Sequence, residues 1–85
     1  MAKTQHHYVY ILQSIANPER FYTGITSQPL RQRLWLHNQG TTRHTNKYRP
    51  WRLRTALLFD DLERAQEFEK YLKSGSGRAF AKKRF

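Results

Sequence analysis

The chain of 85 residues has no cysteine, few acidic residues and no long apolar run. The absence of cysteine excludes disulfides and thiolate metal sites. No apolar stretch approaches the roughly 20 residues that a membrane-spanning helix needs, and the first residues, MAKTQHH, lack the apolar core of a signal peptide. A chain of this size builds one modest core. We therefore expect a single domain over residues 1–85, with flexible ends at 1–6 and 83–85, in a small cytoplasmic protein.

The scarcity of acids leaves the chain strongly basic. Lys and Arg number 16 against 6 Asp and Glu, which gives a formal net charge of +10. No acidic residue occurs between Arg20 and Phe59, whereas five of the six acids lie between Asp60 and Glu69. Such an excess of one charge repels itself in the folded state, so we expect an anionic partner. Nucleic acid is the first candidate and a membrane surface the second; solubility alone is the simpler alternative.

Hydrophobic periodicity predicts three strands and three helices. The strand patterns cover His7–Gln13, Arg20–Thr26 and Trp51–Phe59, and Asn17-Pro18 predicts a turn that makes the first two a hairpin. The helix patterns cover Pro29–Asn38, which Gly40 ends, Asp61–Lys73, and Arg78–Arg84 after the break at Ser74–Gly77.

Strand alternation assigns side chains to faces. On the third strand one face would carry Trp51, Leu53, Thr55 and Leu57, so Trp51 is expected in the core. On the second strand Gly24 marks either a bulge or a place where a backbone or ligand approaches closely, and the sequence leaves both open.

Three polar side chains are expected close together at the second strand and the helix after it. Tyr22 lies on the strand, and Arg33 and His37 are one turn apart on the helix. A phenol, a guanidinium and an imidazole together are typical of a phosphate-handling site. For His37 alone, a hydrogen-bonded packing role is the alternative.

Glu69 is the most informative acid in the chain. It lies within the apolar stripe of the Asp61–Lys73 helix, between Ala65 and Leu72. An inward carboxylate is costly unless it is paired or binds a metal. Either a metal site or a buried ion pair with an arginine would explain it.

The segment Gly40–Pro50 has no apolar periodicity and predicts an exposed loop. Its cationic residues surround Tyr48. Cations for phosphates beside an aromatic ring for base stacking suit single-stranded or distorted nucleic acid. An ordinary solvated loop is the alternative.

The polar positions occur in an order that resembles the GIY-YIG nuclease superfamily, especially its small single-domain bacterial members. The matching positions are Tyr8-Val9-Tyr10, Tyr22-Thr23-Gly24, Arg33, His37-Asn38 and Glu69. Two further runs resemble these members, Trp51-Arg52-Leu53 and the run from Glu69 to Gly75. The similarity spans Tyr8 to Lys82. Tyr8 replaces the glycine of the first family tripeptide, and Thr23 replaces the isoleucine of the second. Arg33 is chosen as the family arginine because of its distance from His37-Asn38.

The resemblance implies an α+β, sandwich-like fold with a small three-stranded antiparallel sheet flanked by helices. It also implies a divalent-metal-dependent endonuclease acting on DNA in repair, recombination or DNA uptake. Tyr10 would take a proton from water, directly or as a phenolate, and Arg33 would hold the phosphate. Tyr22 would hydrogen-bond the phosphate or assist that proton transfer, and His37 would support the base or the phosphate. Glu69 would be the carboxylate that binds Mg²⁺ or Mn²⁺. We expect these five side chains to meet around one hollow.

The expected partner is DNA, single-stranded or branched rather than plain duplex, with a protein partner for targeting. Contacts to it are expected from Arg31, Asn38, Arg43, His44, Lys47, Tyr48, Arg49, Lys73 and Arg78. The alternative is a basic nucleic-acid-binding domain that keeps this fold without cleaving. Membrane-surface binding through Arg78–Phe85 is weaker, because that segment is short.

Overall fold

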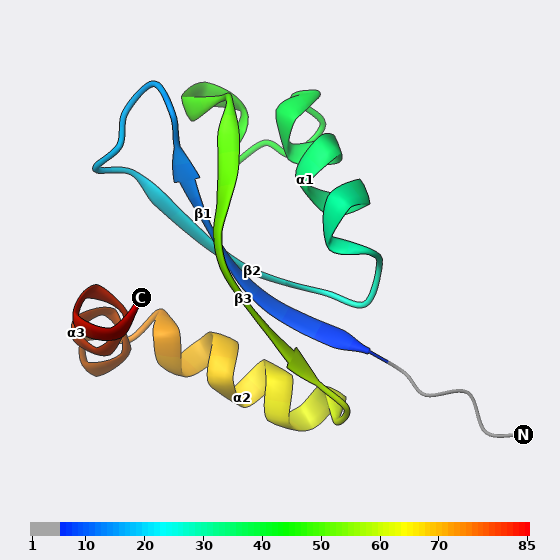
Figure 1. Cartoon of the computed structure of the whole chain (residues 1–85), viewed down its shortest axis with the longest axis vertical. Helices are drawn as coiled ribbons and strands as arrows, with labels where there is room; N and C mark the ends of the chain where they lie inside the picture. Colours follow the sequence, from blue (N-terminus) through cyan, green and yellow to red (C-terminus); the bar gives the residue numbers. More distant parts are fainter. Residues whose placement is uncertain (1–5) are drawn as a thin grey trace, which may run out of the picture.

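The computed structural model describes residues 6–85, which form an α+β fold around one three-stranded antiparallel sheet (Figure 1). The strands are β1 (His7–Ser14), β2 (Phe21–Thr26) and β3 (Trp51–Phe59), in the order β2-β1-β3. The helices are α1 (Leu30–Asn38), α2 (Leu62–Leu72) and α3 (Gly75–Arg84), with a short 3₁₀ helix at Asn46–Tyr48. The expected fold class is confirmed. In residues 6–85 no helix combines the length and the apolarity that a bilayer crossing needs.

The central strand β1 is buried on both faces, which divides the interior into two clusters. Val9 and Ile11 pack with Ala65 and Leu72 on the side of α2 and α3. Tyr10 and Leu12 pack with Trp51 on the other side, where α1 contributes Leu30 and Leu34. Successive residues of a strand point to opposite faces, and helices cover both faces of the sheet (Figure 1). The residues of β1 therefore place Tyr10 on the α1 side.

A bulge in β3 corrects the expected facing of that strand. The pairing of β1 with β3 steps from Ile11↔Thr55 to Leu12↔Leu53, so Arg54 is an extra residue. Because paired residues share a face, Trp51 and Leu53 lie on the α1 side, whereas Thr55 and Leu57 lie on the α2 side. The prediction that all four share one face was wrong, although Trp51 is buried as expected.

The segment Gly40–Pro50 is more ordered than the expected exposed loop. Gly40 has φ +78, the left-handed conformation that ends helices. Thr45 is fully buried, and the backbone carbonyls of Thr45 and Tyr48 accept hydrogen bonds from Trp51 Nε1 (2.7 Å) and Ser14 Oγ (2.7 Å). These contacts fasten the middle of the segment to the sheet, so only part of it faces solvent.

The last helix begins earlier than expected. Ser74 acts as its N-cap, since Ser74 Oγ accepts a hydrogen bond from the backbone N–H of Gly77 (3.1 Å). Any side chain at Gly77 would collide with the backbone of Tyr71, so this glycine permits the close turn between α2 and α3. At the ends of the chain, residues 1–5 of the expected flexible segment lie outside the described residues. Phe85 packs against the α2-side cluster.

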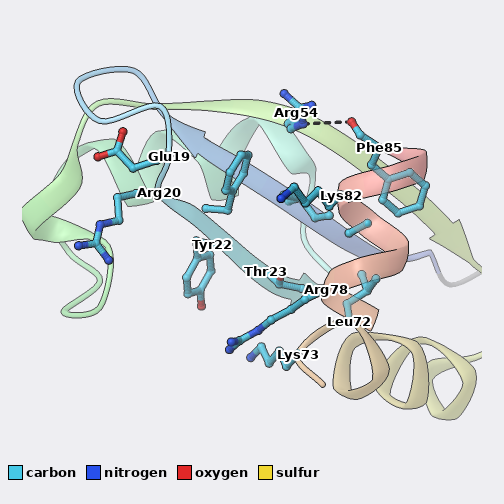
Figure 2. A pocket seen from close by; sticks show the side chains of 13 residues that line it. Glu19, Arg20, Tyr22, Thr23, Arg54, Leu72, Lys73, Arg78, Lys82 and Phe85 are labelled. Carbon is cyan, nitrogen blue, oxygen red and sulfur yellow. Dashed lines mark hydrogen bonds between the residues drawn. The ribbon is translucent and has the colours of Figure 1, made fainter. Parts of the chain in front are cut away.

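A cavity of about 790 Å³ opens on the α3 side of the sheet (Figure 2). It lies between the β2 side of the sheet and α3, and both Tyr22 and Lys73 contribute to its lining.

Candidate active site

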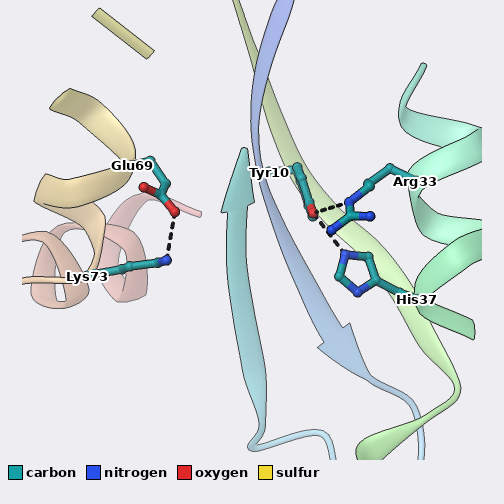
Figure 3. Close-up of polar contacts among 5 residues, drawn as sticks. All are labelled: Tyr10, Arg33, His37, Glu69 and Lys73. Carbon is teal, nitrogen blue, oxygen red and sulfur yellow. Dashed lines mark hydrogen bonds and ion pairs between the residues drawn. The ribbon is translucent and has the colours of Figure 1, made fainter. Parts of the chain in front are cut away.

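Four of the five expected catalytic side chains meet on the α1 side of the sheet. Tyr10 comes from β1, Tyr22 from β2, and Arg33 and His37 from α1. The ring centroids of Tyr10 and Tyr22 are 6.4 Å apart, and those of Tyr22 and His37 are 5.0 Å apart. Arg33 Nε donates a long hydrogen bond of 3.4 Å to the Tyr10 hydroxyl (Figure 3). The strand and helix periods thus bring a phenol pair, a guanidinium and an imidazole together.

A chain of hydrogen bonds orients His37. Its Nε2 lies 2.9 Å from the Tyr10 hydroxyl and its Nδ1 lies 2.8 Å from Thr45 Oγ1. Thr45 Oγ1 also donates to the carbonyl of Thr42 (3.3 Å), so we infer that it accepts from His37 Nδ1–H. His37 Nε2 is then the acceptor for the Tyr10 O–H. His37 is therefore fully buried, and its Nε2 lone pair accepts the hydrogen bond from Tyr10.

Burial keeps both partners of this hydrogen bond neutral near pH 7. Burial raises the pKa of Tyr10 above its usual value, and it outweighs the hydrogen bond from Arg33, which acts in the opposite direction. Burial also lowers the pKa of His37 to about 4, with a further contribution from the positive charge of Arg33. The positive charge of Arg33 also lowers the Tyr10 pKa, but burial exceeds both effects of Arg33. Tyr10 is a phenol here, and His37 is a neutral acceptor.

Gly24 makes room for the tyrosine pair. It pairs with Tyr10 in an unbroken register, which excludes a bulge. A Cβ at this position would lie 2.5 Å from the Tyr10 hydroxyl oxygen and 2.9 Å from Cε2 of Tyr22. The close approach that the sequence left open is therefore made by tyrosine side chains, not by a backbone.

Replacing Gly24 with alanine is expected to disrupt this cluster. The Tyr10 ring is buried and bound to His37, so it cannot move aside without losing that hydrogen bond. We expect a stability loss of about 1–3 kcal/mol and, in any activity of the site, a loss on the order of 10²-fold, since small misplacements are costly. Denaturant unfolding and cleavage assays measure the two. Gly75→Ala is the matched control, because a Cβ there meets nothing within 4 Å. Equal behaviour of the two variants would contradict this account.

Glu69 lies on the other face of the sheet. It belongs to α2, whose Ala65 and Leu72 pack on the face opposite Tyr10, and Figure 3 shows β2 between it and the cluster. Its carboxylate pairs with Lys73 Nζ at 2.7 Å, and its side chain is 19% exposed. The ion pair is with a lysine of the next turn, not with an arginine. Across residues 6–85, no hydrogen bond or ion pair joins Glu69 to Tyr10, Arg33 or His37.

Glu69 is nevertheless close enough to act electrostatically on the cluster, since its charge contributes to the raised pKa of Tyr10.

The side chains around Glu69 fit only a metal ion that needs few ligands from the protein. Within the described part of the chain, no three His, Cys, Asp or Glu side chains gather into a metal-binding group. One carboxylate suits Mg²⁺, which keeps several waters and shares phosphate oxygens of a substrate.

The side chains expected to contact DNA are spread over three regions. The exposed ones of the 40–50 segment are Arg43, His44, Lys47 and Arg49, and Arg31 is exposed on α1. Tyr48 is half-buried against the α1-side cluster, with Arg20 4.9 Å from its ring centroid. Lys73 and Arg78 line the cavity on the α3 side.

Asn38 is used differently from what the sequence indicated. Its amide nitrogen donates to the Trp51 carbonyl (3.0 Å), and its amide oxygen accepts from the Trp51 N–H (2.6 Å). Both ends of the amide therefore fasten α1 to β3, which leaves the expected DNA contact of Asn38 without support.

Sequence reasoning missed two sets of residues. Thr45, which orients His37, has no signal in a polar loop. The cavity adds Arg20, Phe21, Arg54 and Lys82 to the basic and aromatic surface. Alternation could have placed Arg20 and Phe21 on the edge of the sheet and Arg54 on the face opposite Trp51.

A family model described as the GIY-YIG catalytic domain matches residues 6–84. A search of curated proteins found no match. The matched residues include all three strands and all three helices, and so both faces of the sheet described above.

Proposed function

The chain belongs to the GIY-YIG family, and on that premise we propose that it is a divalent-metal-dependent endonuclease that hydrolyses phosphodiester bonds of DNA. The observation that carries the proposal is the hydrogen bond between the Tyr10 hydroxyl and a neutral His37, beside Arg33. It supplies a route for the proton that an attacking water must lose. The net charge of +10 is suited to a polyanionic substrate.

In the proposed reaction Tyr10 accepts one proton and donates another in the same step. Its oxygen accepts a proton from the attacking water while its own proton passes to His37 Nε2, so no free phenolate is needed. The water oxygen bonds to phosphorus, and the bond from phosphorus to the leaving oxygen breaks, so that this oxygen keeps the bonding electron pair and takes a proton from solvent. His37 becomes a cation that keeps its Nδ1–H on Thr45. General-base catalysis of this kind contributes roughly 10²–10⁴-fold.

Arg33 and Tyr22 would position the phosphate. The planar guanidinium of Arg33 donates paired hydrogen bonds to two non-bridging oxygens, a geometry that lysine cannot reproduce. Tyr22 lies at the edge of the sheet beside His37 and is half-buried, so its hydroxyl can donate to the same phosphate. Their joint effect is to hold the phosphorus in line with the water on Tyr10.

Glu69 would hold the metal ion, which when bound neutralises charge that develops on the phosphate. Until then the Glu69 carboxylate is oriented by its ion pair with Lys73. Since the metal has one protein carboxylate, its affinity in the absence of DNA should be weak.

The proposal is tested by incubating labelled single-stranded, duplex and branched DNA with Mg²⁺, with Mn²⁺ and with EDTA. We expect cleavage with either metal and none with EDTA. The Glu69–Lys73 pair and its separation from Tyr10 by β2 favour a second candidate, a binding domain without cleavage. Salt-sensitive binding to DNA with no cleavage under any metal condition would select that candidate.

A further inference from the structure

The cavity on the α3 side combines charge with an apolar floor. Its cationic side chains are Arg20, Arg54, Lys73, Arg78 and Lys82, against one acid, Glu19. Figure 2 shows Lys73, Arg78 and Lys82 on the side of the helices and Arg54 on the strand side, whereas the Arg20 side chain points away from them, with its guanidinium over the Tyr48 ring. The floor is made by apolar side chains of β1, α2, α3 and the residue after α3, namely Ile11, Leu72, Ala81 and Phe85. A site for phosphate alone would need the cations but not this floor.

An aromatic ring stands at the mouth of the cavity. Phe21 is 52% exposed although it is a large apolar side chain, and the Arg54 guanidinium lies 5.6 Å from its ring centroid. Arg54 is held there by hydrogen bonds to the Phe85 carbonyl (3.1 Å) and to Gln13 Oε1 (3.1 Å). Arg54 is the extra residue of the bulge in β3. Arg54 is thus held beside the Phe21 ring before any ligand arrives.

The cavity also adjoins the proposed catalytic site. Tyr22 belongs to the α1-side cluster through its ring contact with His37 and also lines the cavity. Lys73 lines the cavity and pairs with Glu69. A strand whose phosphate lies near Tyr22 and Glu69 can therefore place the adjoining nucleotide in the cavity by crossing the edge strand β2.

We propose that this cavity binds the base of a nucleotide next to the cleaved phosphate of single-stranded DNA. The inference rests on the proposed nuclease function. A volume of about 790 Å³ is within the roughly 300–1,000 Å³ of small-molecule pockets. A stacked, paired base of a duplex cannot enter such a cavity, whereas an unstacked base can lie on Phe21 with its phosphates on the surrounding cations. The chain should therefore prefer unpaired DNA.

The test compares two probes that differ only in their bases. One is a labelled oligothymidylate, and the other is an oligonucleotide of the same length whose units are all abasic. Binding is measured by fluorescence anisotropy in EDTA, so that no cleavage is required. For the unmodified protein we expect roughly tenfold tighter binding of the probe with bases, because aromatic stacking stabilises each bound base.

Variants of Phe21 make the test specific. Phe21→Ala should lower the affinity ratio of the two probes to about one, and Phe21→Trp should retain the ratio because it keeps a stacking face. Trp35→Ala is the matched control, since Trp35 is an aromatic side chain on α1 that is exposed to a similar extent and is not part of the cavity lining. It should leave the ratio unchanged.

Equal binding of both probes by the unmodified protein would overturn the proposal and indicate a surface that reads phosphate or another acidic partner. A ratio that survives in Phe21→Ala would overturn it as well. The two proposals can fail separately. If binding depends on bases but no metal-dependent cleavage occurs, the cavity proposal stands and the nuclease proposal fails. If cleavage occurs but binding does not depend on bases, only the nuclease proposal stands.

Discussion

Glu69→Gln is expected to abolish metal-dependent cleavage of DNA while leaving DNA binding in place. Glutamine keeps the shape of the side chain but removes the charge that attracts a divalent ion, and the charge of Glu69 is one that acts on Tyr10. Because metal ions contribute several kcal/mol to charge stabilisation and 1.36 kcal/mol is a factor of ten, we expect a rate loss on the order of 10³-fold or more. Cleavage of labelled DNA measures it, with anisotropy in EDTA for binding.

Glu67→Gln is the matched control for this variant. Glu67 lies on the same helix and is exposed, so its replacement changes the net charge equally without touching the sheet. Cleavage by Glu67→Gln should be close to that of the unmodified protein. If Glu69→Gln still cleaved with Mg²⁺, Glu69 would be removed from the site, and its pair with Lys73 would be its whole role.

Tyr10→Phe is expected to have the second largest effect. The change removes the one oxygen that contacts both Arg33 and His37 and leaves the buried ring in place. With no atom to pass a proton from water to His37, cleavage should fall by roughly 10²–10⁴-fold. Loss of one hydrogen bond costs about 1 kcal/mol, with a further penalty for leaving a buried partner unsatisfied. The fold should therefore persist, which circular dichroism and thermal unfolding can verify.

Tyr8→Phe is the control for the hydroxyl. Tyr8 is on the same strand and the same face two residues earlier, so its replacement removes one hydroxyl away from the proposed proton route. Tyr8→Phe should cleave normally. Tyr10→Phe activity equal to that of Tyr8→Phe would contradict the proton transfer through Tyr10 and direct attention to Arg33 alone.

The differences between expectation and structure have local physical causes. The apolar stripe of α2 correctly predicted that Glu69 points inward, but helical periodicity cannot tell which face of a sheet a helix will cover. The prediction of side-chain facing in β3 failed at Arg54, because a single extra residue reverses the facing of every residue beyond it. The role of Gly24 could not be decided from the sequence for a similar reason, because the strand pattern identifies a glycine but not the neighbour that needs the space.

The sequence by itself determined the elements, the basic charge and the order of polar positions that match the family. These depend on residue type and on spacing of a few residues, so they can be read locally. Only the tertiary structure decided that His37 is neutral and bound to Tyr10 and Thr45, that Glu69 lies across β2 from them, and that Arg54 and Phe21 form the mouth of a cavity. Burial, pKa and cavity shape arise from segments far apart in the chain, and no local pattern encodes them.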